Sequence, residues 1–241
     1  MKKKAGGMQA VILAGGRGRR LLPYTTVLPK PLMPIGEYPI LEVILRQLER
    51  AGFSDVVICT GHLHEIIRAY LAQSRHPGLS IRYTHEDEPL GTIGPLRLID
   101  HLADTFLVMN GDILTDLDYR KLVAAHGKRR ASATIATYHR EVNVDFGVLE
   151  HDDEGRIRAF REKPTYSFDV SMGIYVFQKE ILNFVPEGRP FGFDELMLAL
   201  IAGGAPVYSH PHHGYWLDIG RPDDYERSIA EFERYRDLFM G

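Results

Sequence analysis

The sequence predicts an α/β protein built on a doubly wound, mostly parallel Rossmann-like sheet flanked by helices. Short apolar runs alternate with longer amphipathic segments through the first half of the chain, which is the order of a parallel sheet joined by crossover helices. A glycine-rich stretch with arginines directly follows the first apolar run. The second half contains more strand-like segments, which we interpret as a β-rich part inserted beside the sheet.

The first half contains repeated strand-then-helix units. Uncharged apolar runs, as expected for strands buried on both faces, cover residues 10–13, 56–59 and 105–109. Apolar residues alternate with polar ones over residues 79–83, which predicts a strand with one polar face. Apolar residues at helical spacing predict helices over residues 37–51, 64–73 and 92–102.

The second half changes character. Strand-like segments cover residues 133–138, 146–150, 157–161 and 172–177. Asp152-Asp153-Glu154-Gly155 predicts a hairpin turn between the second and third of these strands. Helices are predicted over residues 194–202 and 222–239. We expect one domain over residues 1–241, with halves of about 8–120 and 121–241 that share a continuous sheet.

The composition argues against several classes of protein. A formal net charge of −3 gives no general attraction to nucleic acid. The apolar stretches are shorter than the ~20 residues that span a bilayer, and the lysines of residues 1–7 precede no secretory apolar segment. Cys59 is the only cysteine, which excludes an internal disulfide and a cysteine-based zinc site. We therefore expect a cytoplasmic protein without nucleic-acid or membrane partners.

The glycine-rich stretch predicts a loop that binds phosphate. Gly15, Gly16 and Gly18 follow the first strand, where glycine lets the backbone approach a ligand closely. Backbone N–H groups of such a loop can converge on an anion, and Arg17 and Arg20 add permanent charge. The alternative is a glycine turn with solvated arginines, because a glycine pattern alone is weak support for a site.

Lys30 lies in a proline-rich loop that follows the glycines. Pro29, Pro31 and Pro34 restrict the backbone around it, which would hold the lysine in place. A lysine held near a phosphate loop can neutralise a polyphosphate. The alternative is a surface lysine in a turn.

Two apolar runs end in an aspartate that has a glycine within two residues of it. Asp112 follows Asn110 and Gly111 at the end of one predicted strand, and Asp218 precedes Ile219-Gly220. Ligands of open α/β sheets bind beyond the carboxyl ends of the strands. An aspartate there can hold Mg²⁺ against substrate phosphates, or it can simply cap a turn.

The motifs together resemble the sugar-1-phosphate nucleotidyltransferases, over nearly the whole chain from Ala10 to about Tyr225. Each motif is weak alone, but their order is specific. In one-letter code, the series is GG-x-G-x-R-L-x-P-x-T, K-P-L-x-P, P-L-G-T, G-D, E-K-P, G-I-Y-V-F and W-x-D-I-G.

The resemblance implies a reaction between a nucleoside triphosphate and a sugar 1-phosphate that gives a nucleotide sugar and pyrophosphate. It implies catalytic roles for Arg20, Lys30, Asp112, Lys163 and Asp218, with Asp112 and Asp218 holding Mg²⁺. The implied sugar contacts are Gly147, Glu162, Lys163, Ser171 and Gly173. The implied nucleotide contacts are Leu13, Ala14, Gly15, Gly16, Gly18, Glu86, Pro89, Gly91, Thr92, Asn110 and Gly111. On this basis residues 8–120 form the nucleotide-binding half and residues 121–241 the sugar-binding half.

The implied chemistry is an in-line single displacement. The attacking phosphate oxygen is already a nucleophile, so positioning and cations suffice. Without the resemblance, Glu162-Lys163 would be interpreted as a solvated surface pair, and Thr92 as the cap of the helix that follows it.

The stretch P-L-G-T-x-G-P-L favours one branch of the family. It is similar to the mannose-1-phosphate and heptose-1-phosphate guanylyltransferases, which favours GTP and a mannose- or heptose-type sugar, while ATP, UTP and dTTP remain open. The chain departs from the family pattern at Arg19, where threonine is usual, and at Ser171-Met172, where Asn-Ala is usual.

Other interpretations remain. One is a catalytically silent sugar-nucleotide-binding subunit of the same fold, although the retained charged residues argue against it. A dinucleotide-dependent oxidoreductase is disfavoured because the glycines lack the G-x-G-x-x-G spacing. His210, His212 and His213 predict an exposed loop rather than a metal cluster. We expect no carboxy-terminal β-helix domain, and a homodimer is compatible with the sequence.

Overall fold

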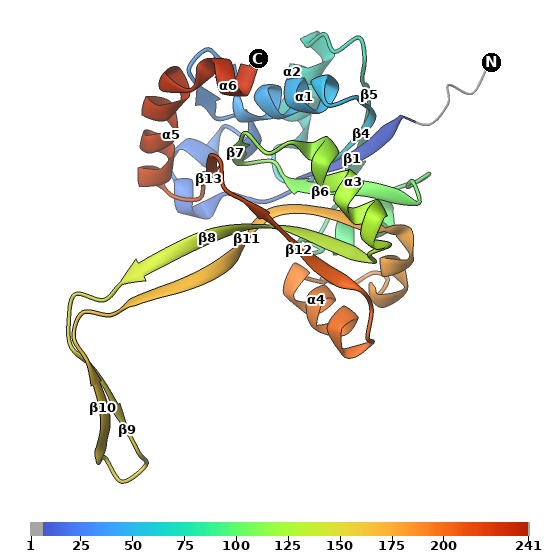
Figure 1. Ribbon diagram of the computed structural model, residues 1–241. Coiled ribbons are helices and arrows are strands. Elements are labelled where there is room, and N and C mark those ends of the chain that lie inside the picture. The colour runs from blue at the N-terminus through green and yellow to red at the C-terminus, as the bar shows by residue number, and fades with distance from the viewer. Residues whose placement is uncertain (1–6, 241) are drawn as a thin grey trace.

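The computed structural model describes residues 7–240, and seven strands of this part form one sheet. Their order is β12-β8-β11-β6-β1-β4-β5 (Figure 1). β11 runs antiparallel to both of its neighbours, and the other strands share one direction. The predicted mostly parallel sheet is therefore confirmed. The strands are β1 (Met8–Ala14), β4 (Phe53–Thr60), β5 (Ser80–His85), β6 (Thr105–Asn110), β8 (Ala133–Asn143), β11 (Thr165–Gln178) and β12 (Val207–His212).

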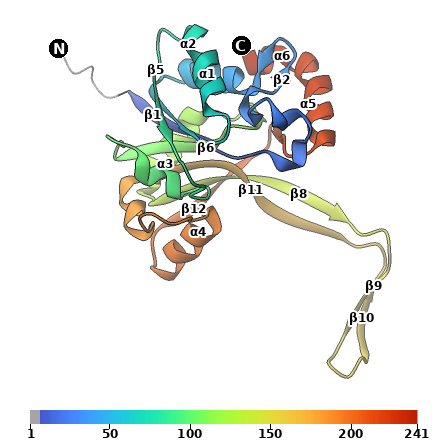
Figure 2. The same cartoon turned by 180° about the vertical axis from the view of Figure 1, so that it is seen from behind.

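Helices cover both faces of the sheet. The core on one face is packed by α1 (Ile40–Arg50), α2 (His64–Gln73), α3 (Tyr119–Arg129), α5 (Pro222–Arg234) and α6 (Arg236–Met240). The core on the other face is packed by α4 (Phe193–Ala202) and the 3-10 helices Gly94–Leu98 and Lys179–Phe184. Figures 1 and 2 show α1, α5 and α6 on one side of the sheet and α4 on the other.

The alternation of side chains along β1 explains why its sequence is apolar throughout. Ala10 and Ile12 enter one core and Val11 enters the other, and all three are fully buried. A strand between two helical layers has no solvent face, so every position favours an apolar residue.

Short antiparallel pairs complete the fold. β2 (Pro34–Ile35) pairs with β3 (Tyr38–Pro39), and β7 (Ile113–Thr115) pairs with β13 (Trp216–Asp218). β9 (Val148–His151) pairs with β10 (Ile157–Arg161). The remaining 3-10 helices are Arg19–Leu21, Tyr24–Thr26 and Lys30–Leu32.

The prediction of a helix over residues 92–102 is wrong, and it is the longest difference between the predicted and the observed elements. Only the 3-10 helix Gly94–Leu98 forms there. The amides of Ile93 and Gly94 donate to the carbonyl of Phe191, at 3.0 and 3.1 Å, and Pro95 has no N–H to donate. This stretch is therefore tied to a distant loop.

Four other elements differ from prediction. The helix expected over residues 222–239 is interrupted at Tyr235, and β11 begins at Thr165 rather than at residue 172. Helix α3 and strand β12 were not predicted. Asp118 starts α3 by accepting from the amides of Arg120 and Lys121, at 3.0 and 3.2 Å.

β8 and β11 continue beyond the sheet as a two-stranded ladder that ends in the β9–β10 hairpin. Residues 139–170, which we call the arm, project away from the rest of the chain in both views (Figures 1 and 2). Every residue of the arm is at least partly exposed. Among the helices described, none is long and apolar enough to cross a membrane.

Candidate active site

A cavity of about 720 Å³ opens where the loops after β1 and β6 meet. This volume lies within the range of small-molecule and cofactor sites. All eleven sequence-predicted nucleotide contacts line it, together with Arg20, Lys30 and Asp112. β1 and β6 are adjacent parallel strands, so their carboxyl ends bring Leu13 and Asn110 side by side. This is the position at which open α/β sheets bind ligands.

The glycine loop is shaped by its own hydrogen bonds. Gly18 adopts φ +60°, a left-handed conformation that favours glycine. Its carbonyl accepts from the Leu21 amide and from the Thr25 hydroxyl, both at 2.9 Å. Arg17, Arg19 and Arg20 are exposed and line the cavity. The loop therefore presents three guanidinium groups along one rim.

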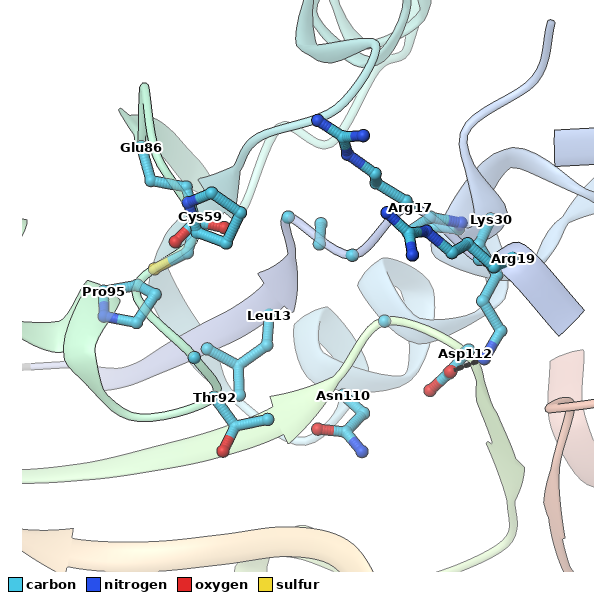
Figure 3. Close-up of a pocket in the computed structure, with 18 of the residues that line it drawn as sticks. Leu13, Arg17, Arg19, Lys30, Cys59, Glu86, Thr92, Pro95, Asn110 and Asp112 are labelled. Carbon is cyan, nitrogen blue, oxygen red and sulfur yellow. Dashed lines mark hydrogen bonds and ion pairs between the residues drawn. The ribbon is translucent and has the colours of Figure 1, made fainter. Parts of the chain in front are cut away.

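The cavity has two chemically different sides (Figure 3). Arg17, Arg19, Lys30 and Asp112 lie on one side of the glycine loop. Glu86, Cys59, Pro95 and Thr92 lie on the other. The first side suits phosphate groups, and the second, which has apolar walls, suits a base.

Lys30 and Asp112 form an ion pair on the charged side. Their side chains are only 14% and 16% exposed. The 3-10 helix Lys30–Leu32 holds the lysine, since the amide of Met33 donates to the carbonyl of Lys30 at 3.1 Å. The proline-rich loop thus delivers Lys30 to the end of β6.

Asp218 lies beside this pair although it is distant in sequence. The β7–β13 pairing places Asp218 opposite Ile113, and the Ile219 amide donates to the Asp112 carbonyl at 3.0 Å. Burial raises the pKa of Asp218, and the neighbouring Asp112 carboxylate raises it further. Lys30 and Arg20 oppose that rise. Arg20, Lys30 and Asp112 line this end of the cavity, and Asp218 lies close to all three without lining it.

The carboxylate pair fits a divalent cation. Asp112 Oδ1 is buried and has no hydrogen-bond partner among residues 7–240. An unpartnered buried oxygen next to a second carboxylate is a donor set that Mg²⁺ accepts, because that ion takes one or two protein carboxylates and completes its shell with phosphates and water. In the same part of the chain, no cluster of three or more His, Cys, Asp or Glu residues could hold a metal by itself.

The other side of the cavity is tied together by backbone contacts. Glu86 accepts from the Leu90 amide at 2.9 Å, and burial raises the pKa of its carboxyl group. Gly91 has φ +78°, and a Cβ atom there would lie 2.7 Å from the carbonyl oxygen of Phe191. Only glycine allows this close approach.

Thr92 does not cap the segment that follows it, so that alternative is wrong. Its hydroxyl accepts from the amide of Phe193, at 2.8 Å, at the first turn of α4. The sequence could not show this because the partner is 101 residues away.

Sequence reasoning assigned no individual role to five lining residues: Arg19, Pro31, Cys59, Pro95 and Gly220. Cys59 pairs with Leu13 in the sheet register, so the rule that places ligands at strand ends could have found it. Burial raises the pKa of its thiol to about 12. Pro31 directly follows Lys30 in the sequence, and Gly220 lies two residues after Asp218, so the neighbouring predicted residues were an available signal.

The predicted sugar contacts divide into two groups. Ser171 and Gly173 lie where β11 joins the sheet, and a Cβ atom on Gly173 would be 2.7 Å from Asn110 Nδ2. Gly147, Glu162 and Lys163 lie on the arm, where a Cβ atom on Gly147 would be 3.2 Å from Glu162 Oε2. None of these five residues lines the cavity, although Gly173 lies against Asn110, which does. The arm projects away from the rest of the chain (Figure 1).

The prediction that three histidines lie in an exposed loop is wrong for two of them. His210 and His212 belong to β12 and are half-buried, while His213 is exposed. His212 Nε2 lies 2.9 Å from Asp116 Oδ1. Pairing of β12 with β8 forms this segment into an edge strand.

Comparison with known proteins agrees with this geometry. Residues 9–234 match the family model described as nucleotidyl transferase. Over 92% of its length the chain is 34% identical to a UTP–glucose-1-phosphate uridylyltransferase from Synechocystis sp., and over 94% it is 33% identical to a mannose-1-phosphate guanylyltransferase from Mycobacterium tuberculosis. It spans 62% and 65% of those two proteins.

A relative of similar length also matches. The chain is 33% identical to a D-glycero-alpha-D-manno-heptose 1-phosphate guanylyltransferase from Aneurinibacillus thermoaerophilus, over 95% of this chain and 100% of that protein. Among solved structures, HddC from Yersinia pseudotuberculosis superposes with a TM-score of 0.71 at 26% identity, covering 93% of this chain and 99% of that one. A putative glucose-1-phosphate thymidylyltransferase from Bacillus anthracis gives a TM-score of 0.72 at 25% identity, covering 93% and 94%.

Proposed function

The chain belongs to the nucleotidyl transferase family, and on that premise we propose that it transfers a nucleotidyl group from a nucleoside triphosphate to a sugar 1-phosphate, releasing pyrophosphate. The observation that carries this proposal is the Lys30–Asp112 ion pair with Asp218 beside it, at the end of a cavity rimmed by arginines. The reaction must bring two anions together, and this arrangement supplies the opposite charge and fixed positions.

The chemistry proposed is a direct displacement at the α-phosphorus. A phosphate oxygen of the sugar 1-phosphate attacks in line, and the bond from the α-phosphorus to the bridging oxygen breaks. The electron pair of that bond leaves with pyrophosphate, so every atom is accounted for without a covalent enzyme intermediate. In this proposal Arg20 stabilises the leaving pyrophosphate and Lys30 neutralises the α-phosphate, and both residues line the cavity.

The two carboxylates are proposed to hold Mg²⁺. Asp112 would contribute its unpartnered oxygen and Asp218 its neighbouring carboxylate. When bound, the ion would neutralise phosphate charge on the triphosphate. Lys30 would keep Asp112 oriented while that oxygen is engaged.

GTP is the nucleotide we favour, with a mannose- or heptose-type sugar 1-phosphate. The P-L-G-T-x-G-P-L stretch supports this choice, since Pro89, Gly91, Thr92 and Pro95 all line the base side of the cavity. The guanylyltransferase names of two relatives agree with it. UTP, dTTP and ATP are the alternatives, and a uridylyltransferase and a thymidylyltransferase stand among the similar proteins.

The test is pyrophosphate release, measured with GTP, ATP, UTP, CTP and dTTP against a panel of hexose and heptose 1-phosphates in the presence of Mg²⁺. We expect release that requires both substrates and is fastest with GTP and a mannose- or heptose-type sugar. Faster release with another nucleotide would overturn the choice of base while keeping the reaction. Absence of release with every pair would overturn the proposed activity and favour a silent binding subunit.

A further inference from the structure

The arm carries apolar side chains on one face, together with Arg140, and polar side chains on the other. In the β8–β11 ladder, Val142 lies opposite Tyr166, and residues directly opposite each other in an antiparallel pair share a face. Phe168 belongs to the same face, and Val142 and Phe168 are 50% and 53% exposed. The other face carries polar pairs such as Thr165 with Asn143. Alternation of this kind is typical of a sheet that packs on one side.

The tip of the arm repeats the pattern. Leu149 and Phe160 lie opposite each other in the β9–β10 hairpin and are 51% and 61% exposed. Phe146, just before the hairpin, is 77% exposed. An isolated two-stranded hairpin is marginally stable in water, and a gathered set of exposed apolar side chains marks an interaction surface.

The arm does not line its own pocket, because none of residues 139–170 is among the lining residues. Seven consecutive pairs run from Ser171–Thr137 to Thr165–Asn143, a stretch of roughly 20 Å at ~3.3 Å per residue. At its root, Trp216 Nε1 donates to the Met172 carbonyl at 3.1 Å, and the indole ring packs 5.3 Å from the Tyr138 ring. The ladder therefore carries the tip away from the sheet edge in a fixed direction (Figure 2).

The segment between two lining residues of the pocket carries a second set of exposed apolar side chains. Leu22, Tyr24 and Val27 lie between Arg20 and Lys30 and are 56%, 53% and 73% exposed. The rim therefore has exposed apolar side chains next to the phosphate side, and the arm has exposed apolar side chains next to Glu162 and Lys163.

We propose that two copies of this chain exchange arms, so that each pocket receives Glu162 and Lys163 from the other copy. A second copy is the occupant we infer because it carries both surfaces. In a dimer with a two-fold axis, the arm of each copy packs on the rim of the other, so both apolar surfaces are covered, as in closed dimers with reciprocal contacts. The role of Glu162 and Lys163 in binding a sugar 1-phosphate rests on the proposed function. The exchange of arms between two copies rests only on the exposed apolar side chains of the arm and the rim.

The first test measures the mass of the protein by light scattering. Arm exchange predicts a dimer for the native chain and a monomer for the double variant Val142→Ser and Phe168→Ser. The matched control is Leu198→Ser with Ile201→Ser, because these residues are 69% and 65% exposed on α4, away from the arm. The control should remain a dimer. A monomeric native chain, or an arm variant that stays dimeric, would overturn the exchange.

The second test is complementation. Chains with Asp112→Asn and chains with Lys163→Ala, each with its own affinity tag, are co-expressed, and dimers carrying both tags are purified. One of the two sites in such a dimer combines a native pocket with a native arm, so it should give about half the native rate per dimer. Each variant alone should be inactive while melting as a folded dimer. Inactive mixed dimers, or an active Lys163→Ala dimer, would overturn delivery between copies.

The two proposals fail in different ways. If the native chain releases no pyrophosphate with any substrate pair, the proposed function fails, and light scattering still decides the exchange. If the native chain is active but mixed dimers are not, the function stands and the exchange of catalytic residues is wrong.

Discussion

Replacing Gly91 by alanine should destabilise the protein far more than a matched glycine replacement. Gly91 has φ +78°, and the new Cβ atom would lie 2.7 Å from the Phe191 carbonyl oxygen and 3.0 Å from its carbon. Gly188, three residues before Phe191, has φ +67°, and a Cβ atom there would have no neighbour within 4 Å among the described residues. Both variants carry the left-handed strain of ~1–2 kcal/mol.

The difference between the two variants comes from the Phe191 backbone. Its carbonyl accepts from Ile93 and Gly94 at 3.0 and 3.1 Å, and its amide donates to Leu90 at 2.9 Å. If the clash breaks these bonds at about 1 kcal/mol each, Gly91→Ala loses roughly 2–3 kcal/mol more than Gly188→Ala. At ~2–4 °C per kcal/mol for a chain of this size, the melting temperatures should differ by roughly 4–12 °C.

The assay is thermal unfolding of both variants and the native chain in the same buffer, followed by circular dichroism. Gly91→Ala should also weaken nucleotide binding, because Pro89 and Thr92 line the cavity on either side of it. Equal melting temperatures for the two variants would refute the argument that the Phe191 loop fixes the base side of the cavity.

Three further predictions concern the same site. Asp112→Asn should lower kcat for pyrophosphate release by on the order of 10²–10³, as expected when a charged group at the reacting phosphate is lost, and a change of less than threefold in steady-state assays would contradict its role. Asp218→Asn should raise the melting temperature of the protein in EDTA at pH 7, because a carboxyl group whose pKa is raised by folding opposes folding when it is ionised. This gain should vanish below about pH 3, where the carboxyl group is protonated in both the folded and the unfolded chain. A lower melting temperature of the variant at pH 7 would refute this prediction. Thr92→Val should cost about 1 kcal/mol in urea unfolding because α4 loses its hydroxyl acceptor, whereas the exposed control Thr165→Val should change stability by less than half as much.

The middle of the central sheet was predictable because β1, β4 and β6 are buried on both faces. The apolar runs at residues 10–13, 56–59 and 105–109 became β1, β4 and β6, with boundaries that differ by a few residues. The helix predicted over residues 92–102 failed because the amides of Ile93 and Gly94 have a distant acceptor. Local periodicity contains no information about such a partner.

The nucleotide side of the site was predictable for a related reason. Leu13, Asn110 and Cys59 end adjacent strands, so topology alone brings their loops together. The β7–β13 pairing brings Asp218 close to Asp112. The sequence motif identified Asp218 but did not predict this pairing.

The sugar side could not be predicted in the same way. The E-K-P motif identifies Glu162 and Lys163, but their position depends on the path of the arm, which follows from the uninterrupted β8–β11 ladder. The motif was recognisable, whereas the separation of these residues from the pocket of their own chain required the structure.

A single-turnover reaction tests the proposed direct displacement at the α-phosphorus most directly. The protein is in excess over GTP labelled at the α-phosphate. Mannose 1-phosphate and Mg²⁺ are added, and the reaction is quenched at intervals. Direct displacement predicts that the label passes from GTP to the nucleotide sugar in step with pyrophosphate release, with none attached to protein at any time. In the Asp112→Asn variant the label should stay in GTP. Label attached to the protein, or released as nucleotide without sugar, would contradict direct displacement.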